Sequence, residues 1–149
     1  MQYRKPATSI KKLCFIAAVV SSLYFAASPV WAIDIIAHPS TQAITLTSYK
    51  ARAIFGGRIR SWPNGIPLKV FMFNTSNNIH KQMCREILNI FPRQLRRAWD
   101  RQIYSGITQG PFIVNSEDEM LKMIRSHKGA IGYIFSATSK EGVNVIDIK

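Results

Sequence analysis

Four arginines in one short segment are the side chains best able to bind a charged partner. Arg93, Arg96, Arg97 and Arg101 follow one another at spacings of three, one and four, which clusters them on one side of a helix. Such a patch can bind a polyanion or an envelope partner through its charge, and the same pattern is also typical of a solvated helix face. Because the segment has neither an RNP-type aromatic motif nor a helix-turn-helix pattern, nucleic acid is not an expected partner.

The other polar residues form no pattern of a catalytic or metal-binding site. No two His, Cys or carboxylate residues stand at ligand spacing, so neither a metal nor another cofactor is expected. His38 is predicted to be a polar residue at a strand end, and His127 to lie at a helix C-terminus, where the dipole favours a cation. The 8 Asp and Glu include no paired motif for acid–base work. The chain is therefore not expected to be an enzyme.

The N-terminal segment has the pattern of a secretory signal peptide. A basic start precedes an apolar run from Leu13 to about Ala27, and Val30-Trp31-Ala32 is a cleavage site with small residues. We expect cleavage after Ala32, which leaves residues 33–149 as one periplasmic domain. A signal anchor is the alternative, but the apolar run is short for a membrane span.

The next two properties of residues 33–149, the part expected to be exported, are its charge and its cysteine content. The chain has 20 Lys and Arg against 8 Asp and Glu, and the leader holds four of the basic residues and no acid. The remainder is therefore still basic. Cys84 is its single cysteine, so an internal disulfide is excluded. The helical pattern around Cys84 favours burial over pairing with another chain.

Helices and strands alternate along residues 33–149, which predicts an α/β domain with a mixed or mostly parallel sheet. Strands are expected at residues 33–38, 66–73, 112–114, 130–135 and 143–148. Helices are expected at residues 48–55, 79–90, 92–105 and 117–126. Ligands of such sheets bind beyond the carboxyl ends of the strands.

The segment Ile54–Gly65, IFGGRIRSWPNG, combines a helix stop, a tryptophan and a turn. Gly56 is expected to end the helix in a left-handed conformation, which costs a residue with a Cβ about 1 kcal/mol. Trp62 is expected to cover the end of the core, and Pro63-Asn64-Gly65 to turn the chain into the next strand. We interpret the segment as structural rather than as a ligand contact.

Two segments together resemble motifs of the phosphate-binding proteins of phosphate ABC transporters. They are Ile54–Ile59 with Trp62, and Gly129-Ala130-Ile131-Gly132-Tyr133, which stand in the family's order and spacing. The resemblance covers about residues 35–145 and is greatest to single-lobe proteins with a PBP-like domain. It implies an α/β fold: a single lobe of a type 2 periplasmic-binding-protein-like fold, with a mixed sheet flanked by helices.

The resemblance also implies a place for an anion. In two-lobed phosphate binders the second lobe contributes an Arg and a Ser-Gly-Thr loop at a helix N-terminus. The matching segment here is Asn74-Thr75-Ser76-Asn77-Asn78, with Asn74 at the Arg position and Asn78, Ile79 and His80 at the Ser-Gly-Thr positions. The helix N-terminus is kept and the dedicated donors are not. Backbone N–H groups with the Thr75 and Ser76 hydroxyls would hold an anion weakly.

Two functions follow from these observations. The first is non-enzymatic binding of phosphate or another oxyanion in the periplasm, or an accessory role in phosphate ABC-type uptake with a membrane transporter as partner. The second is an envelope interaction module that has lost ligand binding and docks on a partner or polyanion through the Arg93–Arg101 helix. The sequence leaves the ligand, the partner and the oligomeric state open.

Overall fold

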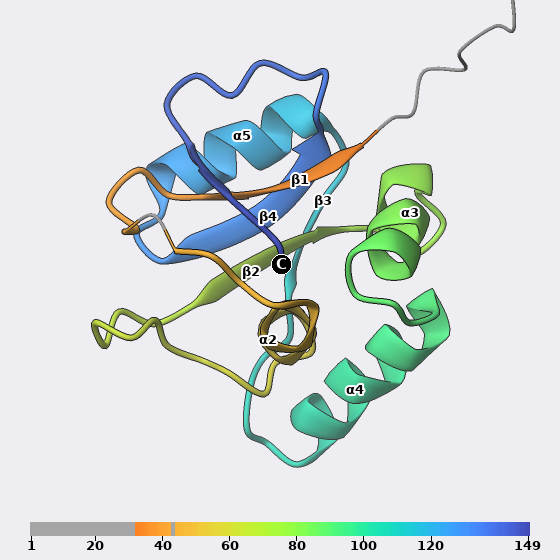
Figure 1. The fold of residues 1–149 in the computed structure, drawn as a ribbon. Helices are drawn as coiled ribbons and strands as arrows, with labels where there is room; N and C mark the ends of the chain where they lie inside the picture. The colour runs from red at the N-terminus through yellow and green to blue at the C-terminus, as the bar shows by residue number, and fades with distance from the viewer. Residues whose placement is uncertain (1–31, 43) are drawn as a thin grey trace, which may run out of the picture. The chain divides into compact units, whose positions relative to one another are not determined.

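A mixed five-stranded sheet forms the centre of the computed structural model (Figure 1), which describes residues 32–42 and 44–149. The predicted signal peptide lies outside the described residues, apart from Ala32. The strands are β1 (Ile33–Ala37), β2 (Lys69–Phe73), β3 (Phe112–Val114), β4 (Ala130–Phe135) and β5 (Asn144–Ile146). They lie in the order β3-β2-β4-β1-β5. β2 is parallel to β3 and β4, whereas β1 is antiparallel to β4 and β5.

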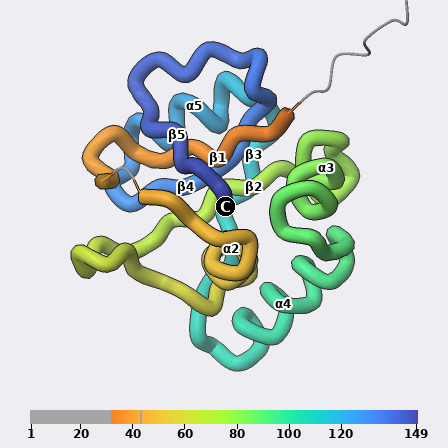
Figure 2. Tube along the Cα trace, viewed as in Figure 1, coloured from red at the N-terminus to blue at the C-terminus, as the bar shows by residue number. Residues whose placement is uncertain are grey.

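Helices cover both faces of this sheet, and the predicted α/β class is confirmed. They are α2 (Ser48–Phe55), α3 (Asn78–Glu86), α4 (Pro92–Tyr104) and α5 (Glu117–Ser126). Successive residues of β4 point to opposite faces. A Cβ on Gly132 would meet Met120 of α5, while the Tyr133 ring contacts Phe55 of α2 and lies near His80 of α3. α4 lies outside this arrangement, beside α3 (Figure 2). In the described part of the chain, every helix is too short or too polar to cross a bilayer.

Side-chain caps begin three of the helices where the sequence predicts. The side-chain oxygens of Thr47, Asn77 and Ser116 accept from backbone N–H groups in the first turns of α2, α3 and α5. α4 begins at Pro92, whose missing N–H is no loss at a first helical position. The Gln94 side chain accepts from the Phe91 N–H at 2.8 Å and completes this start.

Two predicted strands and one predicted helix are shorter in the structure by more than one residue. β2 begins at Lys69 rather than residue 66, because Leu68 donates its N–H back to the Arg60 carbonyl at 2.8 Å in a small hairpin. β5 ends at Ile146, beyond which Ile148 bridges to Leu46. α3 ends at Glu86 rather than residue 90, and the chain turns through Asn89, whose φ is 51°.

The two segments that carry the family resemblance contact one another. The indole Nε1 of Trp62, which is 4% exposed, donates to the Gly129 carbonyl at 3.1 Å. Trp62 therefore ties the hairpin to the start of β4, as its predicted structural role requires. The predicted left-handed residue at the end of α2 was wrong: Gly56 has φ −92°, and it is Gly57 that has φ 74°. Gly57 also lies against the ring of Trp99, where a Cβ would come within 2.9 Å.

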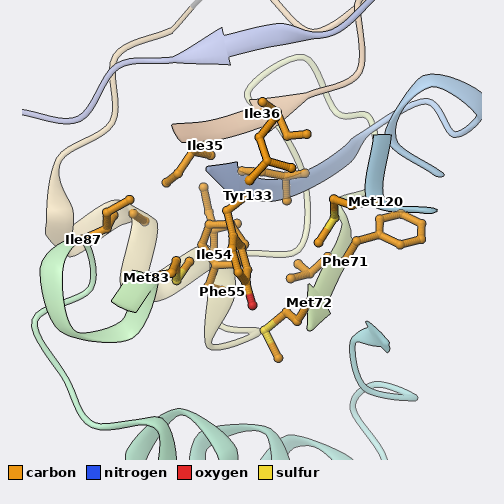
Figure 3. Packing of buried hydrophobic residues seen from close by; sticks show 14 of the residues in the cluster. Ile35, Ile36, Ile54, Phe55, Phe71, Met72, Met83, Ile87, Met120 and Tyr133 are labelled. Carbon is orange, nitrogen blue, oxygen red and sulfur yellow. The ribbon is translucent and has the colours of Figure 1, made fainter. Parts of the chain in front are cut away.

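Tyr133 lies at the centre of the core (Figure 3). Its ring meets Phe55 and Phe73 edge-on, at centroid distances of 5.7 and 5.6 Å. Such edge-to-face contacts add to the free energy gained by burying the rings. Because Phe55 belongs to α2 and Phe73 to β2, the ring joins a helix and two strands.

Replacing Gly129 with Ala tests the packing between the two segments. A Cβ at Gly129 would meet the Pro67 carbonyl oxygen at 2.1 Å, and φ there is +77°. We expect Gly129→Ala to lower the free energy of unfolding by about 3 kcal/mol, from overpacking and backbone strain together. Urea unfolding followed by tryptophan fluorescence measures this change.

Gly106→Ala is the matched control, because Gly106 has φ +69° and no atom within 4 Å of its would-be Cβ. It should cost about 1 kcal/mol, from backbone strain alone. Equal losses in the two variants would contradict the proposed close packing of Gly129 on Pro67.

Candidate functional site

A groove of about 970 Å³ lies between the loop after β2, α3 and the start of α4. We call it the α3–α4 groove. Its lining residues are Thr75, Ser76, Lys81, Arg85, Ile90, Phe91, Pro92, Arg93, Gln94, Arg96 and Arg97. The loop follows the carboxyl end of a sheet strand, where an α/β sheet leaves room for a ligand.

The groove brings together some residues of each of the two sites predicted from the sequence. Thr75 and Ser76 of the loop line it together with three of the four arginines. Arg101 does not, and it lines a separate hollow with Arg52 and Arg58. Each residue of a helix advances by about 1.5 Å, so Arg101 lies about 12 Å further along α4 than Arg93. Asn74, Asn77 and Asn78 belong to the loop but do not line the groove.

Two cations of the groove are missing from the sequence prediction. Lys81 and Arg85 lie one turn apart on α3, and both are exposed. The signal for them was present, since the buried positions of α3 are Ile79, His80, Met83 and Cys84. Lys81 and Arg85 therefore had to lie on its outer side, and only the turn at Asn89 directs that side toward α4.

The loop residues bond mainly to one another. The Asn74 side-chain oxygen accepts from the Ser76 N–H at 3.3 Å and lies 3.4 Å from the Thr75 and Ser76 hydroxyls. Asn77 caps the Ile79 N–H at 2.8 Å. A separation of 3.4 Å is long for an O–H···O bond, so these hydroxyls can turn toward another acceptor at little cost. The N–H groups of Asn78 and His80, in the first turn of α3, have no acceptor within the helix.

The groove is strongly positive. Lys81, Arg85, Arg93, Arg96 and Arg97 line it, and no carboxylate does so among the described residues. Within residues 44–116 the acids are Glu86 and Asp100 alone, and both lie outside the groove. The ion pair found in the described part of the chain, Lys140 with Asp34, is elsewhere. Unneutralised cations on facing helices create a positive potential that attracts anions.

A buried polar chain holds the loop in place from below. The Tyr133 hydroxyl accepts from the Phe73 N–H at 3.1 Å and lies 2.7 Å from Nδ1 of His80. The other ring nitrogen of His80, Nε2, lies 3.6 Å from the Cys84 sulfur. Because Phe73 and His80 flank the loop on either side, this chain fixes both of its ends.

Burial sets the protonation of these groups. Desolvation lowers the pKa of His80, which is 1% exposed, so the ring is neutral and faces the core rather than the groove. Desolvation also raises the pKa of the Cys84 thiol to about 12 and raises the pKa of the Tyr133 hydroxyl. The predicted burial of Cys84 is confirmed. His80 stands at a donor position implied by the family resemblance, and the structure instead makes it a positioning residue.

The other histidines lie where the sequence predicts. His38 follows β1 and contacts the Ser40 hydroxyl at 2.7 Å. His127 caps the end of α5, with its ring 2.9 Å from the Met123 carbonyl. Within the described residues, no three His, Cys, Asp or Glu side chains are grouped as a metal site requires.

The fold is shared with solved phosphate receptors. No family model and no curated protein match the sequence. An ABC-type phosphate transport receptor from Vibrio cholerae is 14% identical with a TM-score of 0.61, over 78% of this chain and 45% of its own. PstS from Borrelia burgdorferi is 17% identical with a TM-score of 0.62, over 79% of this chain and 47% of its own.

A third structure was solved with phosphate bound. It is a putative phosphate ABC transporter substrate-binding protein from Clostridium perfringens, 18% identical with a TM-score of 0.62, over 78% of this chain and 44% of its own. The chain thus spans a little under half the length of these proteins. Its fold is a single lobe of the type 2 periplasmic-binding-protein-like class. The resemblance predicted from the sequence is confirmed at the level of the fold.

The buried His80 predicts a pH-dependent stability. The unfolded chain takes up a proton at the ordinary pKa of about 6.5, whereas the pKa of folded His80 is lower. Stability is therefore full above about pH 6.5 and is lost as pH falls, by up to about 1.4 kcal/mol per pH unit. Urea unfolding between pH 7.5 and 5.5 measures the slope.

His80→Gln should flatten this slope, because the amide does not titrate. His38→Gln is the control, and it should keep the slope because His38 lies outside the buried chain. The slope rather than the absolute stability is decisive, since His80→Gln also removes a buried hydrogen bond. An unchanged slope in His80→Gln would exclude His80 as its source.

Proposed function

We propose that this chain is a non-enzymatic, solute-binding-type protein of the periplasm that holds a phosphate-type oxyanion in the α3–α4 groove. The observation that carries the proposal is the meeting of Thr75 and Ser76 with three arginines in one groove. The fold, shared with a receptor solved with phosphate, supports it. The structural neighbours include a transport receptor and a substrate-binding protein, which supports a role without catalysis.

The groove offers two kinds of donor to a tetrahedral anion, while the first-turn residues Asn78, Ile79 and His80 of α3 lie outside its lining. The Thr75 and Ser76 hydroxyls can turn away from Asn74. The guanidinium groups of Arg93, Arg96 and Arg97 can bind two oxygens each. The cations are exposed, so each contact is weakened by water and salt, and binding is weak rather than receptor-like.

An accessory role in phosphate ABC-type uptake follows from this proposal. The chain matches less than half of each neighbouring receptor. A weak site on one lobe suits a protein that works beside a transporter, with a membrane component as partner, better than a stand-alone receptor.

A second candidate function has its own observation. Asn74 stands where the resemblance implies an Arg, and its side chain closes the loop on itself. A loop satisfied internally suits an envelope interaction module that no longer binds solute. Such a module would dock on a protein or polyanion through the Arg93–Arg101 helix.

Calorimetric titration of the exported protein, residues 33–149, with phosphate and then sulfate tests the first candidate. All described helices and strands lie within these residues. We expect saturable phosphate binding that weakens at least about tenfold in Arg96→Gln/Arg97→Gln, because two charge-assisted contacts are lost. Thr75→Ala/Ser76→Ala should weaken it several-fold.

Lys122→Gln/Lys128→Gln serves as the control for charge. It removes two exposed cations on the α5 side of the sheet and should leave phosphate binding nearly unchanged. No heat up to millimolar phosphate would reject solute binding and favour the interaction module. Unchanged affinity in Thr75→Ala/Ser76→Ala would remove the loop from the site.

Export itself is a separate prediction. Expressed with its own N-terminus, the protein is expected in the periplasmic fraction with Ile33 as its first residue, because Val30-Trp31-Ala32 fits signal peptidase cleavage. N-terminal sequencing and intact mass measure this. A Trp31→Pro change beside the cleavage site should leave an uncleaved, membrane-associated form. Recovery of Met1 in the wild-type protein would instead indicate a signal anchor.

A further inference from the structure

We infer that the α3–α4 groove docks on a membrane surface rich in anionic phospholipid, with lipid phosphates on its cations and Phe91 in the interfacial region. The inference rests on the proposed function for the location of the site and for its phosphate chemistry. It goes further in naming the source of the phosphate. Three observations carry it: the size of the groove, its apolar part, and the distribution of charge along the chain.

The groove is larger than one inorganic anion requires. A volume of about 970 Å³ reaches the upper end of what drug-sized ligands occupy. Five cations from two helices line it, while one tetrahedral anion can engage only a few of them. A row of phosphates on neighbouring lipid headgroups can engage all five at once.

The apolar part of the groove favours a ligand that carries apolar as well as anionic groups. Phe91 is 72% exposed and stands between α3 and α4, with Ile90 and Pro92 beside it in the lining. Polyphosphate offers no apolar surface to cover this ring. A bilayer interface does, because it places acyl chains directly below the phosphates. The exposed Phe91 ring would meet the acyl chains, while the arginines of the groove meet the phosphates above them.

Charge is concentrated on the same side of the molecule. Residues 44–116 carry eleven Lys and Arg against two acids, whereas residues 117–149 carry five of each. The first range contains α2, α3 and α4, and the second contains α5, β4 and β5. An anionic surface therefore attracts the groove side and leaves the α5 side without net attraction. This asymmetry would orient the protein before contact.

Vesicle flotation with the exported protein tests the inference. Vesicles of equal parts phosphatidylglycerol and phosphatidylcholine are compared with vesicles of phosphatidylcholine alone. We expect binding to the anionic vesicles only. Each cation at an anionic surface contributes about fivefold to the partition coefficient, so Arg96→Gln/Arg97→Gln should lose about 10- to 30-fold. Phe91→Ser keeps the charge and should still lose about three- to tenfold.

The control variant Lys122→Gln/Lys128→Gln loses the same charge on the α5 side and should lose little binding. An equal loss in this control and in Arg96→Gln/Arg97→Gln would overturn the groove as the docking surface. Unchanged binding of Phe91→Ser would overturn interfacial insertion.

The two proposals fail separately. Vesicle binding without phosphate heat in calorimetry would overturn the proposed solute binding and support docking on lipid. Phosphate heat without vesicle binding would overturn docking on lipid and support the proposed solute binding. Each variant is exposed at the substituted positions, so circular dichroism and urea unfolding should match the wild type and confirm that lost binding is not lost folding.

Discussion

The hydroxyl of Tyr133 is the contact on which the rest of the site depends. It accepts from the backbone of β2 at Phe73 and faces the ring of His80 on α3, while its own strand, β4, lies in the middle of the sheet. The loop from Asn74 to Asn77 spans the distance between those two partners. Because all three groups are buried, a missing partner would leave a polar atom unsatisfied in the core. The loop is therefore held by the core rather than by its own surface bonds, most of which are long.

The two segments that carry the family resemblance hold neighbouring elements in place at the other end of the sheet. Trp62 binds the Gly129 carbonyl, and Gly57 makes room for the ring of Trp99 on α4. Trp99 in turn donates its indole N–H to the Phe55 carbonyl at 2.7 Å. α4 is thus anchored to α2 by one buried tryptophan, and its arginines stay on the surface. The residues that carry the family resemblance thus help to position the helices around the groove, and they do not line it themselves.

Local rules explain most of what the sequence could predict. Caps at Thr47, Asn77 and Ser116 and the proline at position 92 are signals within one turn of the helices they begin, and these helix starts agree with the structure. The fold class followed from the alternation of elements. Strand lengths could not be predicted in this way, because Pro67 and Leu68 pair with Ser61 and Arg60 in a hairpin rather than with a strand of the sheet. Pairing partners are a tertiary property that β-branched composition does not encode.

The two parts of the groove could be predicted from the sequence separately, but their meeting could not. The loop and the arginines were each visible in the sequence, but they meet only in the folded chain, where a connection with a left-handed Asn89 leads from α3 into the neighbouring α4. Asn tolerates that conformation better than other residues with a Cβ, yet nothing nearby in the sequence demands it. Lys81 and Arg85 were missed for the same reason. Arg101 was included because a spacing of four suggests one face, while its position about 12 Å further along the helix than Arg93 takes it beyond the groove.

The burial of Cys84 bears on the proposed export to the periplasm, which is an oxidising compartment. A single thiol there is exposed to disulfide exchange and to peroxide, both of which require the thiolate and access to the sulfur. Cys84 offers neither, since its side chain is fully covered and its pKa is about 12. The same core that positions the loop therefore shields the Cys84 thiol from oxidants. A protein folded in this way keeps an unpaired cysteine without forming mixed disulfides, provided that it folds before an oxidant reaches it.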